Sequence, residues 1–140
     1  MTGKYPHSID AKGRLFFPAK LRDELGSVFY VTLSMSRDKC LSAYSEETWA
    51  KIKAKLESLP YRKQNVMRPI FANATKCELD SQGRILLPQD LRNMVGLDKD
   101  VTVVGAGNHA EIWDAAVYAE KNAKEGTLDH IANVMEELDF

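Results

Sequence analysis

The sequence predicts an α+β fold in which two tandem copies of one small module share a hydrophobic core. The first observation is an internal repeat: residues 10–26, DAKGRLFFPAKLRDELG, recur as residues 80–96, DSQGRILLPQDLRNMVG, at a shift of 70 positions with seven identities in 17. The second is the order of signals in each copy, which runs strand, strand, helix, strand, strand and helix. The third is size, because a module of about 45 residues buries too little apolar surface to be stable alone.

Each copy opens with a strand, a turn and a returning strand, which we expect to form a hairpin. In the first copy the strand covers residues 5–9, and the turn follows directly. The Asp-x-x-Gly pattern is typical of a turn, because the carboxylate of Asp10 or Asp80 accepts hydrogen bonds from turn N–H groups while Gly13 or Gly83 adopts a positive φ. We therefore assign these four residues to turn formation.

A helix of about two turns follows each predicted hairpin. Pro18 and Pro88 stand where proline suits the first position of a helix. Gly26 and Gly96 stand where a left-handed residue commonly ends a helix. The two prolines and the two glycines therefore bracket one short helix in each copy.

Third and fourth strands complete the sheet of each copy. The third strands cover residues 28–33 and 101–104, and the fourth strands end at Tyr44 and Trp113. The segment GAGNHA, residues 105–110, also fits the G-x-G-x-x-A dinucleotide fingerprint. That fingerprint requires a βαβ unit with an acidic residue about 20 positions later, whereas a helical tail follows here. We therefore interpret its glycines as turn residues.

Helices account for the remaining segments. Ser45 and Asp114 are suitable N-caps for a helix after each fourth strand. Between the copies, Pro69 is expected to start or kink a helix. Near the end of the chain, apolar residues again recur at helical spacing, which predicts an amphipathic tail helix. The predicted domains are module 1 at residues 5–47, a helical connector at 48–75, module 2 at 76–119 and a helical tail at 120–140.

The charge is divided between the two halves of the chain. The formal net charge is −1, but residues 1–70 contain 13 basic and 7 acidic residues, a net charge of +6, and residues 71–140 contain 6 and 13, a net charge of −7. Such asymmetry is typical of nucleic-acid contact or charge-directed self-assembly, although uneven solvated surface gives the same pattern. The most basic stretch, residues 51–68, is compatible with binding to DNA, to an acidic face of a neighbouring subunit or to neither.

Other features restrict the class of protein. No window approaches the roughly 18 consecutive apolar residues of a membrane span, and the first residues resemble no signal peptide, so a cytoplasmic protein with no membrane partner is expected. Cys40 and Cys77 match no disulfide or zinc pattern and are expected to be reduced core residues. The three histidines suggest no metal. No catalytic set coincides with the repeat, so we expect no enzyme activity, cofactor or small-molecule substrate.

The repeated motif DAKGRLxxPxxLR at Asp10, with its copy at Asp80, resembles the AbrB/SpoVT swapped-hairpin DNA-binding superfamily. The tandem arrangement, the length, the Cys40-Leu41 stretch and Glu111-Ile112-Trp113 are similar specifically to the MraZ family of bacterial transcriptional regulators. The loop 34–39 is about two residues longer than is usual in that family, and Lys12 of the first turn is replaced by Gln82 in the second.

The resemblance implies a pseudo-twofold β-barrel core made of paired modules and flanked by helices. It also implies that subunits assemble into a ring, with eight subunits expected, and that the ring binds repeated operator boxes in double-stranded DNA. The expected target lies upstream of the division and cell-wall gene cluster, including the protein's own promoter, which places the protein at the nucleoid.

Arg14 and Arg84 are the leading candidates for DNA contact. Each stands just after a turn, where its guanidinium can bond O6 and N7 of guanine in a bidentate manner. The alternative is local, because each arginine lies four residues after an aspartate and can staple its own turn as an ion pair. Both roles are compatible if the aspartate orients the arginine.

Further candidates surround the two turns. Arg22 and Arg92 lie late in the short helices, where they suit either phosphate contact or pairing at the helix C-terminus. Contacts with the DNA backbone are expected for Lys4, His7, Lys12, Lys76 and Gln82, with surface solvation as the alternative. The main rival function is an antitoxin-like protein-interaction module, which would be marked by a disordered, aromatic-rich tail. The ordered-looking tail of this chain does not resemble one.

Overall fold

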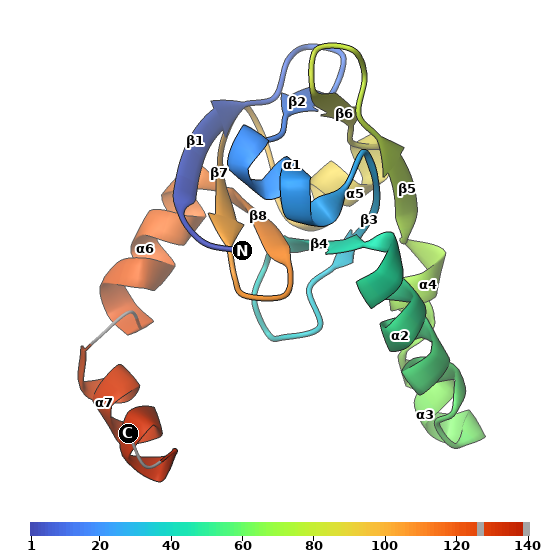
Figure 1. Ribbon diagram of the computed structural model, residues 1–140, viewed down its shortest axis with the longest axis vertical. Helices are drawn as coiled ribbons and strands as arrows, with labels where there is room; N and C mark the ends of the chain where they lie inside the picture. Colours follow the sequence, from blue (N-terminus) through green and yellow to red (C-terminus); the bar gives the residue numbers. More distant parts are fainter. Residues whose placement is uncertain (126–127, 139–140) are drawn as a thin grey trace.

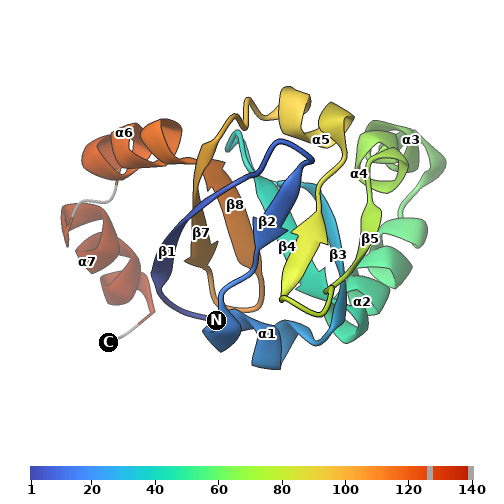
Figure 2. The same ribbon diagram turned by 90° about the horizontal axis from the view of Figure 1, so that it is seen from above.

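The computed structural model describes residues 1–125 and 128–138 (Figure 1). The predicted tail, residues 120–140, therefore includes four residues, 126, 127, 139 and 140, that lie outside the described ones. The fold is α+β, as the sequence predicts, with a mostly antiparallel sheet and seven named helices within the described ranges. Figure 2 shows the sheet from above, with helices at both of its sides.

Six strands form the main sheet, and two short strands form a separate ribbon. The sheet has the order β1-β7-β8-β4-β3-β5, and all of its neighbouring strands are antiparallel. The ribbon pairs β2 with β6. The bounds are β1 Lys4–Ser8, β2 Arg14–Phe16, β3 Val28–Leu33, β4 Leu41–Ser45, β5 Thr75–Glu78, β6 Arg84–Leu86, β7 Asp100–Gly105 and β8 Ala110–Asp114.

The expected hairpin between the first two strands of each copy forms at its turn, but the ladder of paired strands expected beyond the turn is wrong. After the turn, β1 and β2 share only the bridge between Ile9 and Leu15. Instead, β1 pairs with β7 of the second copy, and β5 of the second copy pairs with β3 of the first. An isolated hairpin is marginal in water, and pairing between the copies places β1 and β5 beside the longer strands β7 and β3 in one sheet. Each of the strands β1, β2, β5 and β6 therefore pairs with a strand of the other copy.

The helices follow the predicted signals closely. The first short helices are α1 Ala19–Leu25 and α5 Gln89–Met94, and Pro18 and Pro88 serve as their N-caps, one position before the expected one. Gly26 and Gly96 have φ of 84° and 65°. Ser45 Oγ accepts a hydrogen bond of 3.2 Å from Thr48 N. The other helices are α2 Glu46–Glu57, α3 Tyr61–Val66, α4 Arg68–Ala72, α6 Ala115–Glu125 and α7 Leu128–Glu137.

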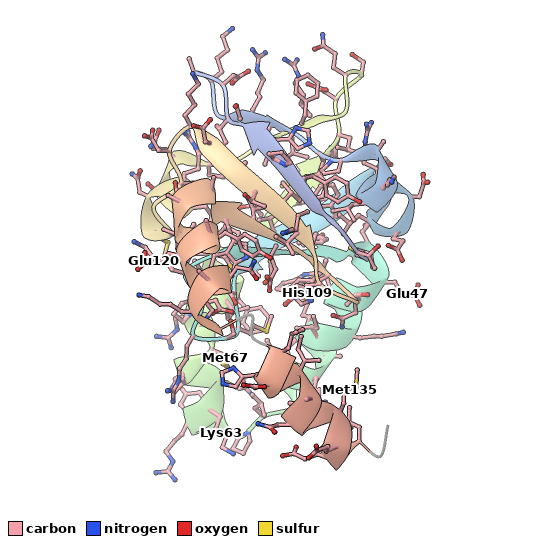
Figure 3. The ribbon with its side chains drawn as sticks, turned by 90° about the vertical axis from the view of Figure 1, so that its left-hand side faces the viewer. Glu47, Lys63, Met67, His109, Glu120 and Met135 are labelled. Carbon is pink, nitrogen blue, oxygen red and sulfur yellow. The ribbon has the colours of Figure 1, made fainter. Side chains whose placement is uncertain are left out.

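Two helical arms extend from opposite sides of the sheet (Figure 1). One consists of α2, α3 and α4, and the helix break expected near Pro69 falls at Met67, between α3 and α4. The other consists of α6 and α7. Figure 3 shows Lys63 on α3 and Met135 on α7, both at the end of the molecule remote from the turns that precede β2 and β6.

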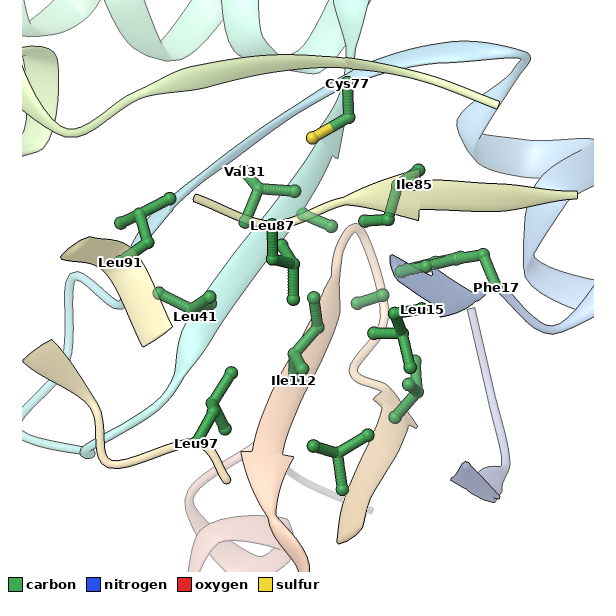
Figure 4. Close-up of a cluster of buried hydrophobic side chains, with 14 of the residues drawn as sticks. Leu15, Phe17, Val31, Leu41, Cys77, Ile85, Leu87, Leu91, Leu97 and Ile112 are labelled. Atoms are coloured by element: carbon green, nitrogen blue, oxygen red, sulfur yellow. The ribbon is translucent and has the colours of Figure 1, made fainter. Parts of the chain in front are cut away.

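The main core is built from both copies (Figure 4). Leu15 and Phe17 of the first copy and Ile85 and Leu87 of the second are buried together beneath the ribbon. A smaller cluster of Tyr44, Trp49 and Ile70 joins α2 and α4 to the sheet. Because the larger cluster draws residues at corresponding repeat positions from both copies, neither copy contains a complete core of its own.

Both cysteines are buried and free, as expected. Burial raises the pKa of the Cys40 and Cys77 thiols to about 12. Residues 106–109 connect β7 to β8, and Gly107 in this connection has a φ of 83°. Gly107 is therefore a turn residue, as predicted, whereas Gly105 is the last residue of β7 and pairs with Ala110.

Candidate nucleic-acid interface

The two Asp-x-x-Gly-Arg turns lie on one face of the molecule, at its top in Figure 1. Each turn leads into one strand of the ribbon, in which Arg14 lies opposite Leu86 and Phe16 lies opposite Arg84. The two arginines are therefore diagonal neighbours, with Cα atoms about 7–8 Å apart. Their side chains share the outer face of the ribbon, because the intervening Leu15 points into the core.

The first turn is organised by the carboxylate of Asp10. Its Oδ1 accepts hydrogen bonds of 2.9 Å from the N–H groups of Lys12 and Arg14, and its Oδ2 accepts one of 2.7 Å from Arg14 Nε. The backbone closes the same turn, because Gly13 N donates to Asp10 O at 3.0 Å and Asp10 N donates to Arg14 O at 3.0 Å. The carboxylate thus fixes both the backbone of the turn and the direction of its arginine.

The second turn repeats this geometry around Asp80. Its Oδ1 accepts 2.9 Å hydrogen bonds from the N–H groups of Gln82 and Arg84, and its Oδ2 accepts one of 2.8 Å from Arg84 Nε. In both turns the hydrogen bond from the backbone N–H of the arginine is the first cause that lowers the pKa of the aspartate, with the guanidinium contributing further. Both carboxylates are therefore held in the ionised form that the turn requires.

The ion pair with the aspartate uses only the Nε atom of each guanidinium. Nε of Arg14 and of Arg84 binds the aspartate, whereas their Nη atoms make no hydrogen bond within the described residues. The two arginines differ in access, with 35% of the Arg14 side chain exposed against 18% for Arg84. The difference has a local cause, because the Arg84 guanidinium lies 5.8 Å from the ring centroid of Phe16. Arg14 faces the smaller Leu86 instead.

Each turn also rests on the other copy. Phe17 N donates a 3.0 Å hydrogen bond to Gly83 O, and Leu87 N donates one of 2.9 Å to Gly13 O. Glycine suits these positions because φ is 82° at Gly13 and 78° at Gly83, a backbone conformation that other residues rarely adopt. A Cβ on Gly13 would lie 2.9 Å from Nη2 of Arg92, and a Cβ on Gly83 would meet the guanidinium of Arg22.

Arg22 and Arg92 therefore lie beneath the turns of the opposite copies. Arg92 Nε donates a 3.1 Å hydrogen bond to Leu87 O, and its Nη2 donates one of 3.0 Å to Gln89 Oε1. In Arg22 the buried Nε has no hydrogen-bond partner within the described residues. The structure thus places both side chains against the turns that carry the leading candidates.

The other predicted residues lie at several different places relative to the two turns. Lys12 and Gln82 are exposed at the tips of the turns. His7 is partly buried in a groove of about 420 Å³ beside Phe16 and Arg22, and burial lowers its pKa. Lys76 is exposed on β5 opposite Tyr30, and Lys4 lies at the end of β1 remote from the turns, opposite Val104. The structure therefore does not bring Lys4 together with the two arginines.

Sequence reasoning missed four residues at this face. Phe16 is 47% exposed and Leu86 is 61% exposed, so two large apolar side chains lie between the arginines. The alternation of strand residues could have identified them, since burial of Leu15 and Ile85 turns their neighbours outward. Lys20 lines the groove beside His7, and Lys99 lines a groove of about 430 Å³ beside Asp10.

The part of the chain that the structure describes contains no helix long and apolar enough to cross a membrane. Among the same residues, no three or more histidine, cysteine, aspartate or glutamate side chains are grouped so that they could hold a metal ion.

Comparison with known proteins identifies the family. A family model described as "MraZ protein, putative antitoxin-like" matches residues 1–66 and 70–136. Relatives named Transcriptional regulator MraZ are similar over most of their length. The one from Acetivibrio thermocellus is 43% identical over 137 residues, covering 95% of this chain and 94% of that protein. The one from Thermoanaerobacter sp. (strain X514) is 41% identical over 144 residues, covering 100% and 99%.

A third relative of the same name, from Moorella thermoacetica, is 46% identical over 121 residues, covering 84% of this chain and 83% of that protein. A solution structure of a protein from Pyrococcus horikoshii is 13% identical with a TM-score of 0.30, over 79% of this chain and 86% of that one.

The fold and the site together define a class of protein. It is an α+β protein built from an internal repeat, which presents two carboxylate-stapled Asp-x-x-Gly-Arg turns on one exposed face. Within that class, the chain belongs to the MraZ family.

Proposed function

We propose that this protein is a sequence-specific regulator of transcription that binds double-stranded DNA through the outer face of the ribbon. One observation carries the proposal: two equivalent arginines, Arg14 and Arg84, are held by Nε on one exposed face with their Nη atoms free of hydrogen bonds to described residues. A guanidinium fixed in this way presents a preorganised donor edge. That edge suits the O6 and N7 acceptors of guanine in the major groove.

The proposal gives each neighbouring group a part. Phe16 and Leu86 supply apolar surface for thymine methyl groups between the two arginines. Lys12, Lys20 and Lys99 flank the ribbon and suit contacts with phosphate. Arg22 and Arg92 act as positioning residues, because they lie under the turns without projecting beyond them.

The pairing of strands between the copies supports a finer description of the fold. We infer a swapped-hairpin arrangement in which the ribbon and the sheet close into a barrel about a pseudo-twofold axis. Corresponding strands exchange partners in the two copies, since β2 pairs with β6 while β1 and β5 each pair with a third strand of the other copy. We propose the module boundaries predicted from the sequence, with residues 5–47 and 76–119 as the repeating units and 48–75 as the connector.

Several copies are expected to act together on DNA. The MraZ resemblance implies a ring of subunits, with eight expected, on repeated operator boxes upstream of the division and cell-wall genes and of the protein's own gene. This proposal places the protein in the cytoplasm at the nucleoid. Linked contacts raise overall affinity by effective concentration, so that a chain with a net charge of −1 can bind DNA through a few basic side chains displayed many times.

The direct test compares Arg14→Ala and Arg84→Ala in a gel-shift titration with the DNA upstream of the protein's own gene. Loss of a bidentate guanine contact corresponds to about 1–3 kcal/mol, or roughly a 5-fold to 150-fold loss of affinity per site. We expect the larger loss from Arg14→Ala, because Arg14 is the more exposed and Lys12 accompanies it where the second turn has Gln82. Arg37→Ala, which removes an exposed arginine between β3 and β4, is the matched control and should retain wild-type affinity.

Salt and sequence dependence complete the test. Lys12→Ala should weaken binding to all DNA sequences alike, and the logarithm of affinity should fall by about 0.9 per phosphate contacted for each unit of log salt. If both arginine variants are folded and bind the upstream DNA as tightly as the wild type, the ribbon is not the DNA-binding face and the proposal fails.

The alternative is an antitoxin-like module whose purpose is to hold another protein. The description of the matching family model favours keeping this candidate. A dependence of affinity on salt that is flat between low and moderate concentrations would support it over DNA binding.

A further inference from the structure

A groove of about 420 Å³ lies between β1 and α1, next to β2 of the ribbon (Figure 1). Three nitrogen-bearing side chains line it: His7 from β1, and Lys20 and Arg22 from α1. Within the described ranges, no aspartate or glutamate lines this groove. Cations and hydrogen-bond donors without acidic neighbours favour an anionic ligand. The remaining lining residues are Tyr5, Phe16, Phe17, Pro18 and Ala19.

The donors of the groove have no acceptor in the part of the chain that the structure describes. The Nε atom of Arg22 is buried and makes no hydrogen bond there. Neither Lys20 nor His7 makes a side-chain hydrogen bond or ion pair with a described residue. Burial lowers the pKa of His7, so its imidazole is neutral at neutral pH and offers one N–H group. A buried N–H group without an acceptor is unfavourable, because it has lost water and gained no partner. A bound anion would supply the missing acceptor.

In the second copy, the chain itself pairs the corresponding arginine. Arg92 Nη2 donates a 3.0 Å hydrogen bond to Oε1 of Gln89, and its Nε donates one of 3.1 Å to Leu87 O. The first copy has Ala19 at the position of Gln89, and a methyl group cannot accept a hydrogen bond. The fold can therefore pair this arginine internally, and the first copy does not do so for Arg22.

Two further differences between the copies act in the same direction. Lys20 corresponds to Asp90, so the second copy has a carboxylate in place of a cation. His7 corresponds to Cys77, so the second copy has a buried thiol in place of an imidazole. Substitutions at separate positions of the repeat thus all make the first copy the more favourable one for an anion.

The shape of the groove restricts the kind of anion. The guanidinium of Arg22 lies against Gly83 beneath the second turn, so a duplex resting on the ribbon does not reach it, whereas a small ligand can. A phosphate group accepts several hydrogen bonds at once and matches the planar donor edge of a guanidinium. The aromatic rings of Phe16, which is 47% exposed, and of Tyr5 add a flat apolar wall. Such a wall favours a ligand that also carries a ring.

We propose that this groove binds a small phosphate monoester, with its phosphate at Arg22, Lys20 and His7 and an aromatic ring against Phe16 and Tyr5. The site occurs once in each chain, because the second copy has lost the open donors. The inference goes beyond DNA binding by the ribbon, and its test is made on the full chain without DNA.

Calorimetric titration of the full chain with phenyl phosphate tests the site. We expect saturable binding of one ligand per chain, and affinity roughly 2-fold to 12-fold higher than for inorganic phosphate because of one added aromatic contact. Benzyl alcohol, which has the ring without the charge, should not bind. Ala19→Gln supplies Arg22 with the acceptor that Arg92 has, and should lower the affinity about tenfold or more. Ala54→Gln, at an exposed alanine of α2, is the matched control and should bind as the wild type does.

A second pair of variants tests the charge. Lys20→Asp introduces the residue of the second copy and should also lower the affinity about tenfold or more, whereas Lys53→Asp on α2 should not. Absence of saturable binding, two ligands per chain, or equal affinity of Ala19→Gln and the wild type would overturn the proposal. Equal affinities for phenyl phosphate and inorganic phosphate would overturn it as well, since the aromatic wall would then take no part. Arg14→Ala should bind phenyl phosphate normally, so failure of the ribbon proposal is distinguishable from failure of this one.

Discussion

Truncation of the core beneath the ribbon tests whether the two copies unfold as one unit. Leu15 and Ile85 are cross-strand partners from different copies, and both are essentially fully buried. Replacing either by alanine leaves a cavity that costs about 2–5 kcal/mol. A domain is stable by only about 5–15 kcal/mol, so each change removes a substantial part of the total. Leu86→Ala truncates the same ribbon on its exposed face and should change the free energy of unfolding by less than about 0.5 kcal/mol.

The assay is urea denaturation at a fixed protein concentration, followed by tryptophan fluorescence. Trp49 reports on α2 after the first copy, and Trp113 reports on β8 of the second. In single-tryptophan backgrounds, Leu15→Ala should shift both reporters to the same lower midpoint. The double variant of Leu15 and Ile85 should depart from additivity, because the two side chains line one site. Two separate transitions, with Leu15→Ala moving only that of Trp49, would refute a shared core.

Three further predictions concern the turns and the thiols. The pKa values of Asp10 and Asp80 are lowered from the ordinary 3.8, so their stabilising effect is fully present above that pH and is lost below it, as the pH falls through the lowered pKa of the folded state. A double Asp→Asn variant should show a shallower acid dependence of its urea midpoint. Gly83→Ala should destabilise the fold more than Gly107→Ala, since both have positive φ but only the first meets another side chain; equal melting temperatures would contradict this. Both buried thiols, with pKa raised to about 12, should react with a thiol reagent at pH 8 only after denaturation, and one fast thiol in the native protein would be inconsistent with the structure.

Local features were the ones that the sequence predicted well. Hydrogen bonds within a few residues determine the Asp-x-x-Gly turn and the Ser45 cap, and φ restricts the residues acceptable at Gly26 and Gly96. The pairing of β1 and β2 was wrong because strand partners are chosen by burial over long sequence separations. Nothing in residues 5–17 encodes that β1 lies beside β7, almost a hundred positions later.

Contacts between residues far apart in the sequence also explain which residues of the candidate site could not be placed. The sequence identified Arg14 and Arg84, and both the predicted staple and an exposed donor edge are present in the geometry. It could not place Arg22 and Arg92, because the glycine that each one contacts belongs to the other copy. Lys99 was overlooked for a related reason: it belongs to the second copy, and its carbonyl accepts a hydrogen bond of 2.8 Å from Ile9 N beside the first turn.

The two turns have matching backbones but different side chains around them. Each turn depends on the opposite copy for the donor to its glycine carbonyl, so the backbones of the two turns are kept alike. The side chains around them are not alike, since Lys12 is matched by Gln82 and the Arg84 guanidinium is covered by Phe16. A pseudo-symmetric scaffold therefore carries an asymmetric surface with its greater positive charge at the first turn. In the proposed complex with DNA, such a surface gives each subunit a preferred direction, which a symmetric pair of turns could not provide.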